Sequence, residues 1–197
     1  MKRVVLVRHG ETEWNREGRM QGHADIPLNA SGRAQSAAVA ARFLGERFDA
    51  LWCSDLVRAR ETADAIGRTV GVVPRPSALW RELEVGELEG VQHFSFGARL
   101  RELMEHPDPL DQPLTPGGES LGAFQRRLRD GWDRIEGENA LVVSHGGAIK
   151  CLLVDLLRIG PHGIDSFSLR HNTGVTVVEI MNGYPRIVLL NCAAHLR

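Results

Sequence analysis

Two histidines in this sequence each follow an apolar run, and each precedes a glycine. His9 lies near the end of VVLVRHG at residues 4–10, and His145 lies in ALVVSHGG at residues 140–147. Such runs are typical of buried strands, and ligands of open α/β sheets bind beyond the carboxyl ends of the strands. One histidine at such a place would most simply be a hydrogen-bonded core or rim residue. Two in the same context favour a catalytic pair at one edge of a sheet.

The surroundings of these histidines suit an anion better than a metal ion. None of the eight histidines forms an H-x-H or H-E-x-x-H pattern, and no acidic cluster accompanies His9 or His145. Their neighbours are arginine, asparagine and glycine, which donate hydrogen bonds. We therefore expect no metal and no other cofactor at this site.

Two arginines lie where they could bind a phosphate group. Arg8 ends the first apolar run, and Arg58 lies in SDLVRARET at residues 54–62, near the first turn of an expected helix. A helix N-terminus attracts anions through its N–H groups and its dipole, and the planar guanidinium pairs well with phosphate. Arg58 is therefore expected to bind phosphate, whereas Arg60 is expected on a solvated helix face.

The elements that must position these residues follow from the hydrophobic periodicity. Apolar runs rich in β-branched residues alternate with longer amphipathic segments, which is typical of an α/β fold with a mostly parallel sheet covered by helices. Asn182 and Gly183 between two apolar runs predict a hairpin and an antiparallel edge strand. We expect strands at residues 4–7, 49–54 and 140–144, a short strand in 71–76, and helices at 31–48, 56–70, 119–135 and 148–157.

These elements fit one three-layer α/β/α domain over residues 1–197, with a lid-like segment at about 91–118. Within that segment residues 94–105 could be helical, and the four prolines of HPDPLDQPLTPGG require a loop. Its apolar residues include Val91, Phe94, Phe96 and Leu100. They could form a wall for a bulky leaving group, but the buried stripe of a lid helix is the simpler interpretation.

Composition and charge indicate a soluble globular protein. Hydrophobic residues make up 43% and charged residues 25% of the 197 residues, and the formal net charge is -1. Neither a nucleic-acid footprint nor a membrane-surface patch is therefore expected. The three cysteines are far apart and odd in number, which excludes a disulfide framework and fits a reducing compartment. Since no signal stretch precedes Val4 and no run reaches transmembrane length, we expect a cytoplasmic protein.

Six segments of the chain together resemble the histidine phosphatase superfamily, a metal-independent group that includes phosphoglycerate mutase. The resemblance extends from Leu6 to Gly147, the order and spacing of the segments carry it, and the expected terminal hairpin fits it as well. The segments are LVRHGETEWN, QGHADIPLNASGRAQ, SDLVRARET, LWRELEVGELEG, TPGGES and VVSHGG. One departure is Leu88, which stands where many relatives have a tryptophan.

The resemblance implies a role for each matching residue. His9 resembles the nucleophile that is phosphorylated on a ring nitrogen, and Glu82 resembles the proton donor. Without the resemblance, the partly apolar segment LWRELEVG offers Glu82 and Glu84 equally. The implied pocket for the phosphoryl group comprises Arg8, Asn15, Arg58, His145 and Gly146, and the implied substrate side comprises Gln21 and Gly22.

These residue types suit phosphoryl transfer, which depends mainly on positioning and on stabilising charge on the equatorial oxygens. Arg8, Arg58 and His145 could supply that field without a metal. His9 must present a neutral nitrogen, so its other nitrogen has to hold the proton, typically by donating to a backbone carbonyl. The clustered arginines would help by lowering the pKa of His9. One carboxyl group can protonate the leaving alkoxide and later activate water.

We therefore predict a metal-independent phosphatase that hydrolyses small-molecule phosphate monoesters through a phosphohistidine intermediate. The alternative is a phosphoglycerate mutase, which returns the phosphoryl group to the substrate. By the same resemblance, mutases of this family have longer chains, with a basic insertion between the carboxyl residue and the second histidine. The interval from Glu82 to His145 is short and contains no lysine, although Arg99 and Arg101 keep the mutase alternative open.

Two readings from other classes are weaker. GESLG at residues 118–122 matches the G-x-S-x-G elbow of serine hydrolases, but that motif needs a preceding strand, and here DQPLTPGG precedes it. Ser120 is therefore expected to cap a helix or to lie at the rim of the site. A binding protein without turnover would have lost a key residue, and none is lost. The expected partner is a small phosphate ester, and an exposed edge strand could pair in a homodimer.

Overall fold

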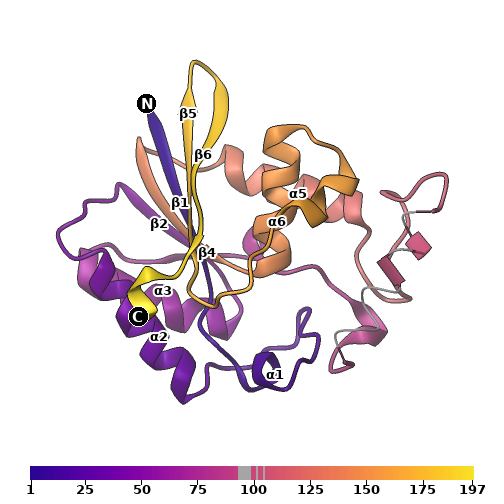
Figure 1. Ribbon diagram of the computed structural model, residues 1–197, viewed down its shortest axis with the longest axis horizontal. Coiled ribbons are helices and arrows are strands. Elements are labelled where there is room, and N and C mark those ends of the chain that lie inside the picture. The colour runs from indigo at the N-terminus through magenta and orange to yellow at the C-terminus, as the bar shows by residue number, and fades with distance from the viewer. Residues whose placement is uncertain (93–98, 101, 104) are drawn as a thin grey trace.

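Six strands form one open mixed sheet in the spatial order β3-β2-β4-β1-β5-β6 (Figure 1). The computed structural model describes residues 1–92, 99–100, 102–103 and 105–197. Strands β1 to β4 pair in parallel, β5 pairs antiparallel with β1, and the edge strand β6 pairs antiparallel with β5. This confirms the predicted fold class. The strand bounds are Lys2–Arg8 (β1), Ala50–Ser54 (β2), Arg75–Ser77 (β3), Asn139–Ser144 (β4), Val175–Met181 (β5) and Tyr184–Cys192 (β6).

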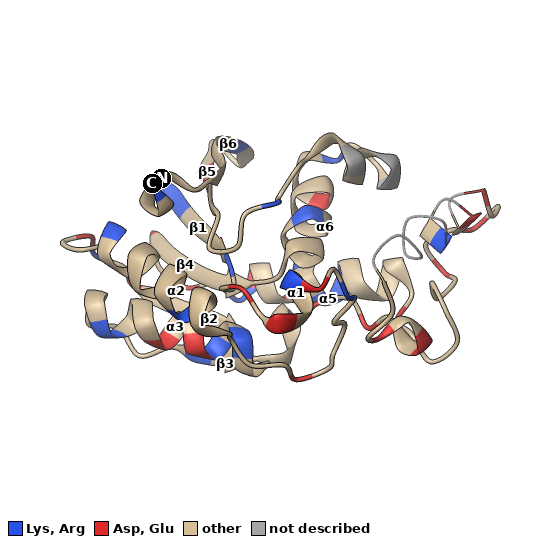
Figure 2. Ribbon diagram, turned by 60° about the horizontal axis from the view of Figure 1, so that its bottom comes forward, with Lys and Arg blue, Asp and Glu red and all other residues tan. Residues whose placement is uncertain are grey.

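Helices cover both faces of the sheet, so the sheet is the middle of three layers (Figures 1 and 2). Successive side chains of a strand point to opposite faces. Val4 and Leu6 of β1 therefore pack in one core cluster with α5 and α6, and Val5 and Val7 pack in the other with α2 and α3. The helix bounds are Glu13–Arg16 (α1), Ala30–Arg42 (α2), Val57–Val70 (α3), Leu121–Asp133 (α5) and Gly146–Leu157 (α6), with short 3₁₀ turns at Ala78–Trp80, Gly86–Leu88, Pro161–Ser166 and Ala194–Leu196.

The register of β1 against β4 places the two predicted histidines side by side. Arg8 pairs with Ser144 in this parallel register, so His9 and His145 are the next residues of the two strands. The backbone N–H of His9 also donates to the carbonyl oxygen of Ser144 at 2.9 Å. Strand β2 flanks β4 on its other side and ends at Ser54, shortly before α3 begins. The polar residues that follow these three strands therefore leave the sheet at one edge.

Several elements are shorter than the sequence predicted, among them helix α5, which spans Leu121–Asp133 instead of residues 119–135. Two of the differences have local causes. Helix α2 ends at Arg42 instead of residue 48. Gly45 has a φ of 83°, a conformation that a helix does not contain, and the chain turns there. Strand β3 begins at Arg75 instead of residue 71, and Pro76 within it lacks the N–H that a longer ladder needs. The predicted hairpin is confirmed, since Asn182 and Gly183 both have positive φ between β5 and β6.

The segment at 91–118 lies only partly among the described residues. Residues 99–100 and 102–103 are helical, whereas 94–98, 101 and 104 of the predicted helix lie outside the described residues. Residues 106–118 form turns and bends, in agreement with their four prolines. That the chain is a single domain with this segment as a lid stays a prediction.

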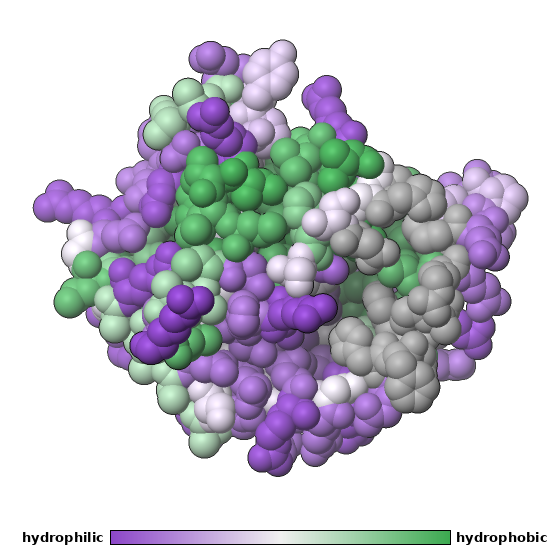
Figure 3. Space-filling model, viewed as in Figure 1, coloured by the Kyte–Doolittle hydropathy of each residue, from purple (hydrophilic) through white to green (hydrophobic). Residues whose placement is uncertain are grey.

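The surface mixes charges of both signs, and the face seen in Figure 3 carries an apolar area. Basic and acidic residues alternate around α2, α3 and β3 in Figure 2, in keeping with the net charge of -1. Apolar side chains gather near the centre of Figure 3, where β6 and the segment around α6 lie in Figure 1. Tyr184, Val188 and Leu190 of β6 are exposed. In the part of the chain that the structure describes, no helix has both the length and the hydropathy to cross a membrane.

Candidate active site

A cavity of about 590 Å³ is lined by all the residues that the sequence analysis assigned to the site. This volume is in the usual range for small-molecule sites. The residues are Arg8, His9, Asn15, Gln21, Gly22, Arg58, Glu82, His145 and Gly146. The fold therefore brings the predicted residues together, while their individual roles stay predictions.

His9 is almost completely buried at the end of β1. Its Nδ1 lies 2.7 Å from the carbonyl oxygen of Gly10. In the neutral ring Nδ1 therefore carries the proton and donates it to this bond, and Nε2 keeps its lone pair. Burial lowers the pKa of His9 well below its usual value, and the charges of Arg58 and Arg8 lower it further. The surroundings thus favour a neutral imidazole with an unprotonated Nε2, which is what a nucleophile needs.

His145 lies against His9, with the ring centroids 5.1 Å apart. Arg58 donates from Nε to Nδ1 of His145 at 3.3 Å, so the proton of the neutral His145 ring is on Nε2. This Nε2 is buried and has no hydrogen-bond partner among the described residues. Burial, followed by the charge of Arg58, lowers the pKa of His145 well below its usual value. His145 is therefore a neutral hydrogen-bond donor in the cavity.

Arg58 is fully buried on α3 and holds other parts of the site in place. Its Nη1 donates to the carbonyl oxygen of Ala24 at 2.7 Å, and its Nη2 donates to that of Gly22 at 2.8 Å. Burial lowers the pKa of Arg58 to about 10, so the side chain is still charged at neutral pH. Besides its predicted contact with phosphate, Arg58 thus fixes the loop at residues 22–24 and the tautomer of His145.

Arg8 supplies a second donor without a partner. Its Nη1 donates to the carbonyl oxygens of Leu169 and Arg170 at 3.0 and 3.1 Å. Its Nε is buried and has no partner among the described residues. A buried donor that makes no hydrogen bond costs about 1–3 kcal/mol. Together with Nε2 of His145, the cavity contains two such donors, which the oxygens of a bound anion would satisfy.

Glu82 lines the cavity, whereas Glu84, the other carboxyl group that the sequence offered, is not among the described lining residues. Oε2 of Glu82 accepts from the N–H of Gly147 at 2.9 Å, and Oε1 accepts from the N–H of Leu83 at 3.0 Å. Gly147 is in the first turn of α6, directly after His145 and Gly146. The tertiary structure therefore places the Glu82 carboxyl group at the start of α6, in the cavity that both histidines line.

Helix α1 and the loop after it contribute another part of the cavity lining. Thr12 caps α1 by accepting from the N–H of Asn15 at 3.1 Å, and its hydroxyl donates to Oε1 of Gln21 at 3.0 Å. Gly22 has a φ of 49°, and a Cβ there would lie 2.6 Å from Oε1 of Glu89. The loop can therefore pass Glu89 closely only with a glycine at this position.

Several residues at the site were missed by the sequence analysis, including three cations that line the cavity, Arg19, Lys150 and Arg170. Asn172 donates from Nδ2 to the carbonyl oxygen of His9 at 3.0 Å and to Oδ1 of Asn15 at 3.2 Å. Lys150 could have been found, because it lies one turn into the helix after SHGG. Asn172 and Arg170 lie in the polar stretch before the last hairpin, whose spacing gave no signal.

Ser120 caps helix α5, as predicted. Its Oγ accepts from the N–H of Ala123 at 3.2 Å. Ser120 is preceded by turns and takes part only in an isolated bridge with Pro113, so the strand that a nucleophile elbow requires does not occur at residues 105–119. Across the described ranges, no three His, Cys, Asp or Glu side chains gather closely enough to hold a metal ion.

Comparison with known families supports the resemblance. The model of the histidine phosphatase superfamily (branch 1) matches residues 4–193, which is almost the whole chain. The chain belongs to the histidine phosphatase superfamily. The match confirms the resemblance, including the fit of the terminal hairpin.

Relatives of this histidine phosphatase have two kinds of name. A putative phosphoserine phosphatase 2 from Hydrogenobacter thermophilus is 30% identical over 100% of this chain and 98% of that protein. A probable phosphoglycerate mutase from Yersinia enterocolitica is 35% identical over 87% of this chain and 82% of that protein. The solved phosphoserine phosphatase from Entamoeba histolytica in complex with 3-phosphoglyceric acid has a TM-score of 0.86 at 30% identity, with 100% of both chains covered.

The buried imidazoles of this histidine phosphatase make its stability depend on pH. His9 and His145 have lowered pKa values in the folded chain, whereas in the unfolded chain they bind protons near pH 6.5. The unfolded state therefore binds more protons below about pH 6.5, down to the lowered native pKa. We expect the free energy of unfolding to fall by about 1 kcal/mol for each imidazole between pH 6.5 and 5.5.

Urea unfolding at pH 7.5, 6.5 and 5.5 measures this loss. His145→Gln should show a shallower decrease than the unsubstituted protein, and replacement of the exposed His106 by Gln should leave the decrease unchanged. An equal decrease in all three proteins would contradict the prediction.

Proposed function

We propose that this histidine phosphatase hydrolyses small phosphate monoesters in two steps, through a phosphohistidine at His9. The observation that carries the proposal is the surroundings of His9. They combine a buried imidazole whose Nδ1 is hydrogen-bonded with two buried donors that have no described partner, Nε of Arg8 and Nε2 of His145. Oxygens of a phosphoryl group would accept from these donors, which also stabilise the charge that the equatorial oxygens carry in the transition state.

The first step forms the phosphohistidine. Nε2 of His9 attacks phosphorus, so that a P–N bond forms while the P–O ester bond breaks. The leaving oxygen takes a proton from the carboxyl group of Glu82.

The second step returns the enzyme to its starting state. The Glu82 carboxylate takes a proton from water, and the water oxygen attacks phosphorus as the P–N bond breaks. Inorganic phosphate leaves, His9 regains its lone pair, and Glu82 holds a proton again. Two steps of this kind each have a lower barrier than direct hydrolysis by water.

The proposed substrates also carry a carboxylate. The charged lining residues that the structure describes are Arg8, Arg19, Arg58, Lys150 and Arg170 against Glu82. This surplus of positive charge attracts a substrate with more than one anionic group. The phosphoserine phosphatase from Entamoeba histolytica was solved in complex with 3-phosphoglyceric acid, which carries a carboxylate besides its phosphate. Phosphoserine and the phosphoglycerates are therefore the first compounds to test.

Release of inorganic phosphate from p-nitrophenyl phosphate, phosphoserine and 3-phosphoglycerate tests the proposal. We expect steady release that is equal with and without a metal chelator. With a sugar phosphate added to the series, we also expect a higher kcat/KM for phosphoserine and 3-phosphoglycerate, which carry a carboxylate, than for the sugar phosphate. No phosphate release from any of these esters would contradict the proposed function.

A mutase is the second candidate, because a relative with that name is 35% identical. Incubation of 3-phosphoglycerate with 2,3-bisphosphoglycerate decides between phosphatase and mutase. A mutase converts 3-phosphoglycerate to its 2-isomer under these conditions without net release of phosphate. Of the two arginines that kept this alternative open, Arg99 is exposed and pairs with Glu102 at 3.0 Å. Arg101 lies outside the described residues. An exposed arginine that pairs with a neighbouring carboxylate is poorly placed to hold a substrate carboxylate. This favours hydrolysis over the mutase reaction.

Location and assembly belong to the same proposal. All three cysteines are unpaired, which supports the predicted reducing, cytoplasmic compartment. Strand β6 lies at the edge of the sheet with Val188 and Leu190 exposed. Such an edge is a surface on which a second copy could pair, and the homodimer stays a prediction.

A further inference from the structure

Arg127 on α5 is a charged side chain that lies mostly buried outside the described lining of the cavity. Its Nε and Nη2 pair with the two carboxylate oxygens of Glu119 at 2.9 and 2.7 Å. The exposed fractions of these two side chains are 17% and 13%. A desolvated ion pair of this kind contributes little net stability by itself. The role of Arg127 therefore has to be sought in the other contacts of its guanidinium.

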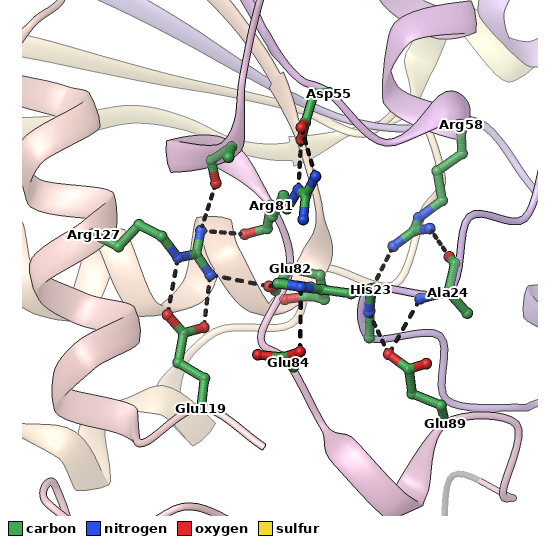
Figure 4. A network of polar contacts seen from close by, with 12 residues as sticks. His23, Ala24, Asp55, Arg58, Arg81, Glu82, Glu84, Glu89, Glu119 and Arg127 are labelled. Carbon is green, nitrogen blue, oxygen red and sulfur yellow. Dashed lines mark hydrogen bonds and ion pairs between the residues drawn. The ribbon is translucent and has the colours of Figure 1, made fainter. Parts of the chain in front are cut away.

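The same guanidinium binds a row of backbone carbonyls in the segment that carries Glu82 (Figure 4). Nη1 donates to three carbonyl oxygens and Nη2 to a fourth, each at 3.1 Å. The acceptors are those of Ala78, Leu79, Arg81 and Glu82. This segment is a 3₁₀ turn followed by irregular chain. Irregular backbone has few partners of its own, and the planar five-donor fork of arginine can satisfy several carbonyls from one direction.

Other contacts fix the remaining sides of this segment. The carbonyl oxygen of Glu82 also accepts from Nε2 of His23 at 2.9 Å. The Arg81 side chain pairs with both carboxylate oxygens of Asp55 at 2.7 Å, and the N–H of Glu119 donates to the carbonyl oxygen of Glu84 at 2.9 Å. Figure 4 shows Arg127 and His23 on different sides of Glu82, and both donate to its carbonyl oxygen. The backbone at Glu82 is therefore held by two side-chain donors, independently of its carboxyl group.

We propose that Arg127, oriented by Glu119, is a positioning residue that holds the Glu82 backbone so that the Glu82 carboxyl group reaches the leaving oxygen. This inference rests on the proposed function, in which Glu82 is the proton donor. A shift of the Glu82 carbonyl would move the carboxyl group away from Gly147 at the start of α6, where it now accepts at 2.9 Å. Misplacement of a catalytic group by about 1 Å can cost about 10²-fold in rate.

The leaving group supplies a readout that a merely structural role would not affect. The p-nitrophenolate anion leaves without protonation, whereas the alkoxide of phosphoserine needs a proton from the enzyme. A defect in the position of the proton donor therefore lowers kcat/KM for phosphoserine more than for p-nitrophenyl phosphate. Binding of inorganic phosphate as a competitive inhibitor should not change, because Arg8 and His145 are untouched.

The test compares Arg127→Lys with Arg126→Lys, its exposed neighbour on the same helix. Lysine keeps the charge but loses the planar fork. We expect Arg127→Lys to lower kcat/KM about 10- to 100-fold for phosphoserine and no more than about 3-fold for p-nitrophenyl phosphate. We expect the inhibition constant of phosphate to stay within about 2-fold, because the phosphate contacts are unchanged. Arg126→Lys should match the unsubstituted enzyme in every measurement.

Two further variants make the result decisive. In a Glu82→Gln background, Arg127→Lys should add no leaving-group effect, because residues that act as a unit are not additive. Glu119→Gln, which weakens the orientation of Arg127, should show the same selective loss in a smaller degree and serves if Arg127→Lys does not fold. Equal losses on both esters, or full additivity with Glu82→Gln, would overturn the inference. An unsubstituted enzyme that releases no phosphate would instead overturn the proposed function.

Discussion

Replacement of His9 by alanine is expected to lower phosphate release from every ester by roughly 10⁴-fold or more, as removal of a covalent nucleophile does in other enzymes. The reason is that His9 is the group whose surroundings keep a neutral nitrogen in contact with the phosphoryl site. Its Nδ1 is committed to Gly10, and burial lowers its pKa. Loss of the imidazole leaves Arg8 and His145 able to bind phosphate but leaves phosphorus without an attacking group.

Two measurements check this expectation. Initial rates with p-nitrophenyl phosphate and phosphoserine give the loss, and quenched labelling with a ³²P-phosphate ester should give an acid-labile, base-stable adduct in the unsubstituted chain but not in His9→Ala. Ser120→Ala is the matched control for the serine-nucleophile alternative. It should cost about 1 kcal/mol of stability as a lost helix cap and leave the rate unchanged. Activity that survives His9→Ala and disappears in Ser120→Ala would refute the histidine mechanism.

Replacement of Glu82 by glutamine is expected to lower kcat/KM for phosphoserine about 10²- to 10⁴-fold, the usual contribution of a general acid. Glutamine has nearly the same shape, but its amide has a single accepting oxygen and can keep only one of the hydrogen bonds from Gly147 and Leu83. It also has no acidic proton to give to the leaving oxygen. The loss for p-nitrophenyl phosphate should be no more than about 10-fold, because its leaving group needs no protonation.

Glu84→Gln provides the matched control for this second prediction. Glu84 lies two positions further along the same segment, and its side chain is 47% exposed, near His23. We expect activity within about 2-fold of the unsubstituted enzyme, as for most surface substitutions. A plot of log kcat/KM against the pKa of the leaving group should become steeper in Glu82→Gln and stay unchanged in Glu84→Gln. A selective effect in Glu84→Gln would show that the proton donor had been assigned to the wrong carboxyl group.

Much of the fold could be predicted because its signals are local. The apolar run of β1 and that of β4 each end in a histidine followed by glycine, and Asn182 with Gly183 specifies the hairpin turn. The predicted bounds were wrong where tertiary packing or one residue interrupts a pattern, as at Gly45 after α2. The segment at 91–118 could not be predicted in detail, since proline-rich chain has no periodicity.

The residues of the candidate site could be predicted from local motifs, whereas the contacts between them depend on long-range packing. The order and spacing of the motifs predicted that His9, Arg58 and His145 lie in one site. In the structure, the register of β1 against β4 brings the two histidines side by side. The hydrogen bond that sets the tautomer of His145 joins residues 87 positions apart. No pattern in the sequence indicated it, because a tautomer depends on which partner each ring nitrogen meets.

The sequence by itself determined the α/β class and the pair of histidines at one sheet edge, and through the family resemblance it predicted Glu82 as the proton donor. Only the tertiary structure decided that Glu82 rather than Glu84 lines the cavity, that two donors remain buried without partners, and that Arg127 holds the Glu82 backbone. The physical reason is the distance along the chain over which each interaction acts. Strand and turn preferences act over a few neighbouring residues, whereas burial and the contacts of a guanidinium arise only when segments 45 or more positions apart pack together.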